Sequence, residues 1–475
     1  MSVPPRKEIH GRTVSEAIVR RLVEMLDAAA ILVAGVVAMH WDATTVDWRL
    51  AGLVVLLGTV LGVNFLHLAG AYRFHKFGRL DSTLSRMLLG WMCTFAALFV
   101  TTRLFEPVTA ADGPWAAAWF TAAMLLMIIT RVVLWQYMHR WHREGRLGDV
   151  VAIVGAGPIA QHLLRDFAVR HAGLRIAGVY DDGARQLPAH CMGHPIRGTV
   201  GDLVQDVRRG HVDTVIVALP LAADRQLANT LNRLCEVPVH VRLCPDAFGL
   251  RLGEVQASHI AGHTFLNVID RPLCDWHCIA KSIEDWLVGA AILIMIAPLM
   301  VLIAVLIKFD SPGPVLFRQK RYGFNNKLIE VLKFRTMYVD QTDINGAQLT
   351  RRNDPRITRL GAFLRKTSLD ELPQFLNVLR GEMSIVGPRP HALSAKAGTL
   401  LYQEAVKYYD ARHRVKPGIT GWAQVNGWRG ETDTIEQIRK RVEHDLYYID
   451  NWSILLDLKI IVRTILGGFT GSHAF

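Results

Sequence analysis

Residues 281–314 read KSIEDWLVGAAILIMIAPLMVLIAVLIKFDSPGP, and this stretch sets the fold expected for the chain. Residues 286–307 carry no charge, and they are numerous enough for a helix of the roughly 20 residues that cross a bilayer. Lys281 precedes the apolar run, and the cations Lys308, Arg318, Lys320 and Arg321 follow it. Because basic flanks stay in the cytoplasm, both ends of the run are expected there.

Pro298 lies in the middle of this run, where a proline removes an internal hydrogen bond and clashes with the preceding turn. Together with the two basic flanks, it predicts a re-entrant hairpin over residues 283–308 that enters and leaves by the cytoplasmic leaflet. An ordinary fifth span that tolerates the proline stays open as the alternative.

Four further apolar blocks lie upstream, near residues 23–39, 50–68, 87–101 and 115–135, each close to the length of a bilayer span. The N-terminal arm and the loops after the second and fourth blocks are basic, whereas the other two loops are acidic. By the positive-inside rule, residues 1–147 form four transmembrane helices with both ends in the cytoplasm. Buried helices of a soluble bundle are the alternative, which leaves the charge alternation unexplained.

The overall composition limits the classes of molecule that this protein is expected to bind. The net charge is +12, and 51% of the residues are hydrophobic. A basic balance suits nucleic acid, anionic lipid or phosphorylated substrates, and the apolar blocks favour lipid headgroups and phosphates, so we expect no nucleic-acid partner. Cys274 and Cys278 flank His277, but no second ligand pair with zinc spacing follows, so free thiols are expected. The first residues lack the apolar core of a cleavable signal peptide.

Residues 148–265 have the pattern of a Rossmann-like α/β domain. The segment DVVAIVGAG predicts a buried strand that runs into a glycine turn, and a helical pattern follows it. Gly155 and Gly157, with Ala160, match the dinucleotide fingerprint, and Asp181 and Asp182 lie where a ribose-binding acid would lie. Such folds can lose their ligand, so a bound nucleotide and a purely structural or regulatory domain both stay open.

The stretch RKTSLDELPQFLNVLRGEMSIVGPRP, residues 365–390, places two adjacent carboxylates, Asp370 and Glu371, among cations. Guanidinium groups bind phosphoryl oxygens, while carboxylates can hold Mg²⁺ or act as nucleophiles, so this set suits a pyrophosphate substrate. Lys333 and Arg335 alternate on an expected strand and would point to one face. The candidate substrate-binding residues are Arg318, Gln319, Arg321, Lys333, Arg335, Arg365 and Arg389.

A structural interpretation of the same two carboxylates stays open. Ser368 and Glu371 have the spacing of a capping box, in which Ser368 would begin a helix and Glu371 would bond back to it. A cap and a catalytic role are compatible, because the N-terminus of a helix also favours anions.

Five motifs in this half of the chain carry a resemblance. They are DSPGPVLFRQ (310–319), KFRTM (333–337), RKTSLDELPQ (365–374), GEMSIVGPRP (381–390) and KPGITGWAQVNG (416–427). In this order they resemble the bacterial sugar transferase domain of the polyprenyl-phosphate hexose-1-phosphate transferases, over residues 281–475. The segments RGET (429–432) and PRPHA (388–392) look most like undecaprenyl-phosphate glucose phosphotransferases.

The resemblance implies a fold and a mechanism. It implies four spans, a CoA-binding-like Rossmann domain, and a mainly α-helical transferase domain that contains the hairpin. Asp370 matches the family's nucleophile toward the UDP-sugar, and Glu371 matches the acid that binds Mg²⁺; Asp370 is a further candidate metal ligand. Arg365 matches a site arginine, and Pro298 matches the residue that breaks the re-entrant helix, although Ala297 replaces the serine that often precedes it.

The expected reaction transfers hexose-1-phosphate, most simply glucose-1-phosphate, from UDP-sugar to undecaprenyl phosphate, with release of UMP, as the initiating step of exopolysaccharide or capsule synthesis. The chain is then expected in the bacterial inner membrane with its active site and termini in the cytoplasm, alone, as a homo-oligomer or with polysaccharide-assembly proteins. UDP-galactose as donor and a non-enzymatic scaffold or regulator remain alternatives. A nucleotide-sugar dehydratase or epimerase is disfavoured, because no Tyr-x-x-x-Lys pair lies in the Rossmann-like region.

Overall fold

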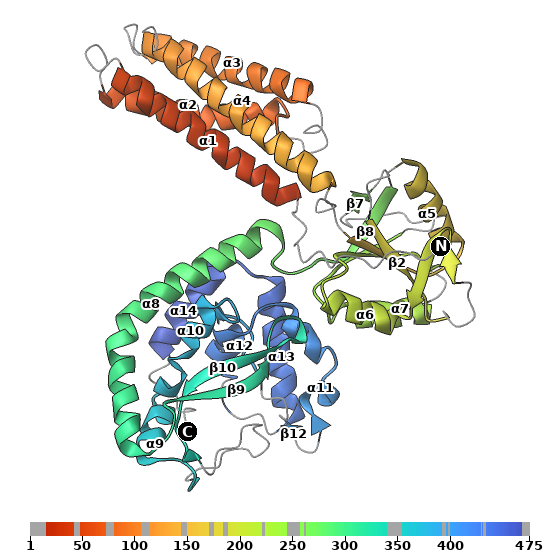
Figure 1. Ribbon diagram of the computed structural model, residues 1–475, viewed down its shortest axis with the longest axis vertical. Coiled ribbons are helices and arrows are strands. Elements are labelled where there is room, and N and C mark those ends of the chain that lie inside the picture. The colour runs from red at the N-terminus through yellow and green to blue at the C-terminus, as the bar shows by residue number, and fades with distance from the viewer. Residues whose placement is uncertain are drawn as a thin grey trace. The chain divides into compact units, whose positions relative to one another are not determined.

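A computed structural model describes residues 16–41, 48–72, 80–105, 114–143, 150–170, 175–183, 189–220, 224–244, 257–260, 263–339, 354–391, 396–397, 400–428, 430 and 434–467 (Figure 1). The chain divides into two compact units, Met1–Asp149 and Val150–Phe475. Within the described residues, five helices are long and apolar enough to cross a membrane. Four of them lie in the first unit and one in the second.

The first unit is a bundle of four apolar helices: α1 (Glu16–Trp41), α2 (Trp48–Leu68), α3 (Leu80–Phe105) and α4 (Pro114–Arg143). They coincide with the four predicted spans. Inside the bundle, the Trp119 indole donates to the carbonyl of Ile31 at 2.9 Å, which links α4 to α1. Gly58 allows α2 to approach α4, because a Cβ there would lie 2.4 Å from the Trp119 ring. The loop charges behind the predicted topology mostly lie outside the described residues.

A buried ion pair also joins two helices of the bundle. Arg131 on α4 donates to both carboxylate oxygens of Asp27 on α1, at 3.2 and 2.7 Å, and both side chains are buried. Charges are expensive in an apolar environment unless they are paired, so this pair fixes how α1 and α4 face each other.

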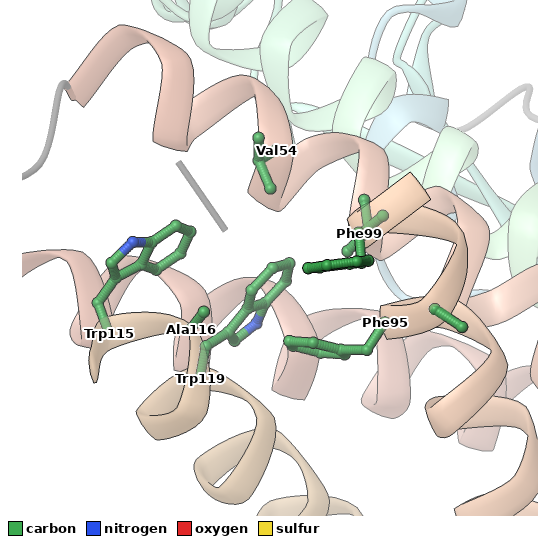
Figure 2. Close-up of a pocket in the computed structure, with 8 residues that line it drawn as sticks. Val54, Phe95, Phe99, Trp115, Ala116 and Trp119 are labelled. Carbon is green, nitrogen blue, oxygen red and sulfur yellow. The ribbon is translucent and has the colours of Figure 1, made fainter. Parts of the chain in front are cut away.

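The bundle also contains an apolar cavity of about 320 Å³. Figure 2 shows that aromatic rings from α3 and α4 surround it, and its lining residues are Val54, Phe95, Ala96, Leu98, Phe99, Trp115, Ala116 and Trp119. None of these lining side chains is charged or could bind a phosphate, so this cavity does not suit a nucleotide sugar.

The second unit begins with a Rossmann-like domain, as predicted. Its strands are β1 (Val150–Val154), β2 (Arg175–Tyr180), β3 (His190–Cys191), β4 (His194–Gly198), β5 (Thr214–Val217), β6 (His240–Leu243), β7 (Ala257–Ile260) and β8 (His263–Ile269). In the described residues they form one sheet of order β3-β4-β2-β1-β5-β6-β8-β7. The inner pairs are parallel and the outer ones antiparallel. Its helices are α5 (Pro158–Arg170), α6 (Val200–Arg208) and α7 (Asp224–Leu234). The sheet continues to Ile269, past the predicted boundary at residue 265.

The C-terminal part of the second unit is mainly helical. Its helices are α8 (Asp275–Asp310), α9 (Arg359–Lys366), α10 (Gln374–Leu379), α11 (Tyr402–Ala405), α12 (Trp422–Val425), α13 (Ile435–Asp450) and α14 (Ile454–Gly467), with 3-10 turns η3 (Phe324–Asn326), η5 (Leu369–Glu371) and η6 (Tyr409–Arg414). The strands form two-stranded sheets: β9 (Leu316–Tyr322) with β10 (Leu328–Phe334), β11 (Ser384–Val386) with β14 (Gly418–Thr420), and β12 (Lys396–Ala397) with β13 (Leu400–Leu401).

The predicted hairpin over residues 283–308 is one continuous helix in the structure. Pro298 lies inside α8 without interrupting it. Figure 1 shows α8 as an arc along one side of the transferase domain, so the helix bends instead of dividing into two arms. A proline removes only one bond of the helical ladder, which permits a bend while the remaining bonds continue the helix.

Both ends of α8 pack on the same domain, and its middle is exposed. Near its start, Lys281 binds Asp457 of α14 at 2.6 Å. Near its end, Ile307 is buried in a cluster with Phe334 and Leu364. Between these anchors, apolar side chains such as Ile294 (76% exposed) lie on the surface. Apolar surface of this extent indicates a membrane-facing side.

Helix α14 is amphipathic. Asp457 and Ile460 are buried against the domain, whereas Leu455 and Leu466 are more than two-thirds exposed. One face of α14 therefore belongs to the core, and the other suits a membrane interface.

Candidate active site

The two adjacent carboxylates lie on η5, a single turn between α9 and α10. Ser368, directly before this turn, has φ 56° and ψ 18°, in the left-handed region, and makes no side-chain capping bond. A capping residue needs extended backbone angles to direct its side chain at the helix. The capping-box interpretation of Ser368 and Glu371 is therefore wrong, and the two carboxylates interact with other groups.

Glu371 is bound by two cations. The Arg389 guanidinium donates from Nη1 to Oε2 at 3.1 Å and from Nη2 to Oε1 at 2.5 Å. Lys333 Nζ, from β10, donates to Oε1 at 2.8 Å. The Glu371 side chain is only 14% exposed, so these charge-assisted bonds act in a partly desolvated site.

Asp370 has a different environment. It is buried, and its Oδ2 lies 3.9 Å from Lys333 Nζ. Among the described residues, no hydrogen bond reaches its carboxylate. One carboxylate of the pair is thus held on both oxygens, whereas its neighbour is held only by a longer-range attraction.

This difference separates the two pKa values. Burial raises the pKa of Asp370 above its ordinary value; the charge of Lys333 opposes this, and the charge of Glu371 reinforces it. Burial would also raise the pKa of Glu371, but the charges and hydrogen bonds of Arg389 and Lys333 outweigh it and hold that pKa well below its usual range. Adjacent acids whose pKa values diverge in this way are typical of sites where each acid has its own role.

Two more predicted arginines lie beside the pair. Arg365 on α9 donates from Nε to the Thr336 hydroxyl at 2.8 Å, and its charge acts on Asp370. Arg321 on β9 donates to the carbonyl of Pro390. Gln319 orients Arg321, since its Oε1 accepts from Nε and Nη2 at 3.1 and 2.7 Å.

Arg318 and Arg335 are not part of this cluster. The Arg318 side chain is 70% exposed and lies 3.6 Å from Glu330. Arg335 is buried, and it donates to the carbonyls of Ser311 and Pro312 at 2.6 and 2.8 Å, just beyond the end of α8. Strand β10 ends at Phe334, so the alternation that would direct Lys333 and Arg335 to one face does not reach Arg335.

Comparison with known proteins agrees with these motifs. The family model described as bacterial sugar transferase matches residues 276–471. A UDP-glucose:undecaprenyl-phosphate glucose-1-phosphate transferase of Klebsiella pneumoniae is 37% identical over 428 residues, which cover 89% of this chain and 90% of that protein. The chain belongs to the bacterial sugar transferase family.

Two other relatives define the extent of the likeness. A protein of the same name from Escherichia coli K12 is 38% identical over 75% of this chain and 76% of its own length. An exopolysaccharide production protein of Rhizobium leguminosarum is 49% identical over 197 residues, which are 42% of this chain but 98% of that protein. A further model, described as a CoA-binding domain, matches residues 67–245.

The carboxylate pair of this sugar transferase fits Mg²⁺ only together with a substrate. Among the described residues, no group of three or more His, Cys, Asp and Glu side chains could hold a metal. Mg²⁺ is commonly held by one or two carboxylates while substrate phosphates and water complete its shell. Asp370 and Glu371 meet that requirement, although Glu371 would share its oxygens with Arg389 and Lys333.

In the dinucleotide fingerprint of the Rossmann-like domain, two backbone amides are already hydrogen-bonded within the domain. Gly155 has φ +100° and donates to the carbonyl of Tyr180 at 2.8 Å. The amide of Ala156 donates to Asp181 at 2.9 Å, so the carboxylate expected to bind a ribose is hydrogen-bonded to the glycine turn. A Cβ on Gly157 would meet nothing within 4 Å, so the turn is open at that position.

Sequence reasoning missed two buried residues behind the site, His391 and Arg412. Arg412 donates to the backbone carbonyl of Arg389 at 2.7 Å, and its Nη1 lies 2.8 Å from Nδ1 of His391. The available signal was the run ARHR (411–414), which places three basic residues close before the KPG of residues 416–418.

Proposed function

We propose that this chain transfers glucose-1-phosphate from UDP-glucose to undecaprenyl phosphate, releases UMP, and thereby initiates exopolysaccharide synthesis. The observation that carries the proposal is the pair Asp370–Glu371, whose pKa values are shifted in opposite directions, in a chain that aligns over 89% of its length with a transferase of that name.

The chemistry requires a nucleophile, and Asp370 is the better candidate of the two acids. Its carboxylate carries no hydrogen bond among the described residues, whereas both oxygens of Glu371 are bonded. A carboxylate oxygen of Asp370 attacks the β-phosphorus, the bond to the bridging oxygen breaks, and UMP leaves with that oxygen. The phosphate oxygen of the polyprenyl acceptor then attacks the same phosphorus and frees Asp370.

The surrounding cations suit the donor's diphosphate. Lys333, Arg321, Arg365 and Arg389 gather around the acids and counter the phosphate charge during transfer. Mg²⁺, held by Glu371 with Asp370, would neutralise the charge that develops on the leaving phosphate.

The membrane placement follows from α8. At about 1.5 Å per residue, the 36 residues of α8 form a helix that is longer than the hydrocarbon core of a bilayer, which is roughly 30 Å thick. Both of its ends pack on one domain, so a full crossing would require that domain on both sides of the bilayer. We therefore place α8 as a bent re-entrant helix, with the active site at the cytoplasmic face, where nucleotide sugars occur. Tags before Met1 and after Phe475 should both be cytoplasmic; an outward C-terminal tag would contradict this placement.

The test is UMP release from UDP-glucose in the presence of undecaprenyl phosphate and Mg²⁺, with the wild type and Asp370→Asn. The wild type should release UMP and the variant should not, because an amide cannot form the phosphoryl bond. Release that survives in the variant would place the nucleophile elsewhere. Release from UDP-galactose but not from UDP-glucose would keep the mechanism and change the sugar, and silence with every UDP-sugar would favour a scaffold.

A further inference from the structure

The segment 388–390, which carries Arg389, is fixed by hydrogen bonds to its carbonyls. Proline has no amide N–H, so Pro388 and Pro390 can form backbone hydrogen bonds only through their carbonyls. The Gly418 amide donates to Pro388 O at 3.0 Å, and Arg321 donates to Pro390 O. Arg412 Nη2 donates to Arg389 O at 2.7 Å. These bonds determine where the Arg389 side chain starts.

Arg412 has little freedom to move. It is 1% exposed, and its Nε and Nη2 donate to Asp445 Oδ2 at 3.0 and 2.7 Å. Its Nη1 faces Nδ1 of His391, and burial together with the charges of Arg412 and Arg441 holds the pKa of His391 well below its usual range. The imidazole is therefore neutral and can accept. A buried guanidinium with every nitrogen engaged keeps one position.

Arg412 belongs to η6, whose two faces meet different parts of the protein. In a 3-10 helix, residues three apart lie on the same side. Tyr409 and Arg412 face His391, and the Tyr409 hydroxyl lies 2.7 Å from its Nδ1. Asp410 occupies another side, where its Oδ2 accepts from Arg208 Nη2 at 2.9 Å and from Asn326 Nδ2 at 2.8 Å.

Arg208 ends α6 of the Rossmann-like domain, and further bonds join that domain to the transferase domain along the same seam. The hydroxyl of Tyr408, directly before η6, donates to Asn232 Oδ1 of α7 at 2.8 Å. Asn325 Nδ2 of η3 donates to the carbonyl of Arg208 at 2.9 Å. This seam is polar, and polar interfaces within a chain adjust more easily than apolar ones.

We propose that η6 couples the Rossmann-like domain to the active site, with Arg412 as the positioning residue that places Arg389. The path runs from Arg208 through Asp410 and the short helix to Arg412, and from its guanidinium to the backbone that carries Arg389. The inference rests on the proposed function, because it assigns Arg389 to the UDP-sugar.

The test uses Arg412→Lys in the full-length chain. Lysine keeps a charge against Asp445 but cannot also reach the carbonyl of Arg389. We expect the KM for UDP-glucose to rise about tenfold, the equivalent of about one charged hydrogen bond, with the KM for undecaprenyl phosphate unchanged. The matched control is Arg131→Lys, a buried arginine of the first unit that donates to the carboxylate of Asp27 at 3.2 and 2.7 Å and takes no part in the proposed path. Equal KM changes in both variants would reduce Arg412 to a structural role and overturn the proposal.

The seam is tested with Arg208→Gln, against Arg209→Gln as control, since Arg209 is exposed and lies 3.6 Å from Asp206. Arg208→Gln should raise the same KM about threefold, a fraction of one charged bond, and Arg209→Gln should not. No change with Arg208→Gln would overturn the coupling.

A wild type that releases no UMP would refute the proposed function instead. The coupling is then tested by the midpoints of thermal unfolding of Arg412→Lys, Arg389→Gln and the double variant. Non-additive midpoint shifts support it, and additive shifts overturn it.

Discussion

The bond between Arg389 and Glu371 allows a quantitative prediction for Arg389→Gln. The substitution removes two charge-assisted hydrogen bonds, at 3.1 and 2.5 Å, and leaves Glu371 with Lys333 as its remaining bonded cation. Each such bond is worth roughly 1.5–3 kcal/mol, but the Arg389 side chain is 27% exposed, which weakens the loss. About 3 kcal/mol is a reasonable total, at the lower end of what breaking a buried ion pair costs.

Activity should fall accordingly. We expect Arg389 to contribute a similar energy to the transition state for UMP release, where a loss of about 3 kcal/mol corresponds to a decrease of roughly 100-fold in kcat/KM. The matched control is Arg318→Gln, which removes an exposed arginine from a 3.6 Å pair with Glu330 and should leave kcat/KM nearly unchanged.

The same variant should change the pH dependence of stability. The pKa of Glu371 is depressed in the folded state, so its stabilisation is present above its unfolded value of 4.5 and is lost as the pH falls through the folded value. Without Arg389 less of this stabilisation exists, so the thermal midpoint should rise less than in the wild type as the pH increases from acid values to 4.5. A wild-type rise together with wild-type kcat/KM would refute the assigned role of the pair.

Four further outcomes are expected. Because the pKa of Asp370 is raised, the acid limb of kcat/KM should lie above pH 3.8, and Glu371→Gln, which removes a repelling charge, should move that limb of the residual activity to lower pH. Arg335→Gln should destabilise the junction after α8 by about 2–3 kcal/mol, seen as faster limited proteolysis there, since it loses the carbonyls of Ser311 and Pro312. Asp457→Asn should lower the thermal midpoint, because Lys281 loses its 2.6 Å partner. Removal of residues 1–270 should keep membrane-bound UMP release, with a KM for UDP-glucose raised a few fold by loss of the seam; complete loss in a folded, inserted protein would contradict a self-contained transferase domain.

Much of the fold was predictable because it depends on neighbouring residues. Apolar runs of span length located α1 to α4, and the strand pattern after Gly148 located the parallel sheet. Hydropathy and alternation are properties of contiguous sequence, so a single chain reveals them. The adjacency of Asp370 and Glu371 is local in the same sense, and it sufficed to direct attention to η5.

The errors have a common cause, which is that local patterns do not determine the partners of a side chain. The Ser368–Glu371 spacing matches a capping box, but the left-handed backbone of Ser368 excludes it. The central proline of α8 suggested two arms, whereas packing of both helix ends on one domain holds a single bent helix. In α8, long-range contacts thus override a short-range preference.

The sequence by itself thus determined the membrane helices, the α/β domain and the two acids of the site. Only the tertiary structure decided which cations serve them: Lys333 and Arg389 reach Glu371 from 38 and 18 residues away, while Arg335 turns to the end of α8. It alone also joined Arg208 to Asp410, 202 residues apart. The physical reason is that a buried charge must find a partner within hydrogen-bonding distance, and the folded core, not the order of the chain, decides which groups come that close.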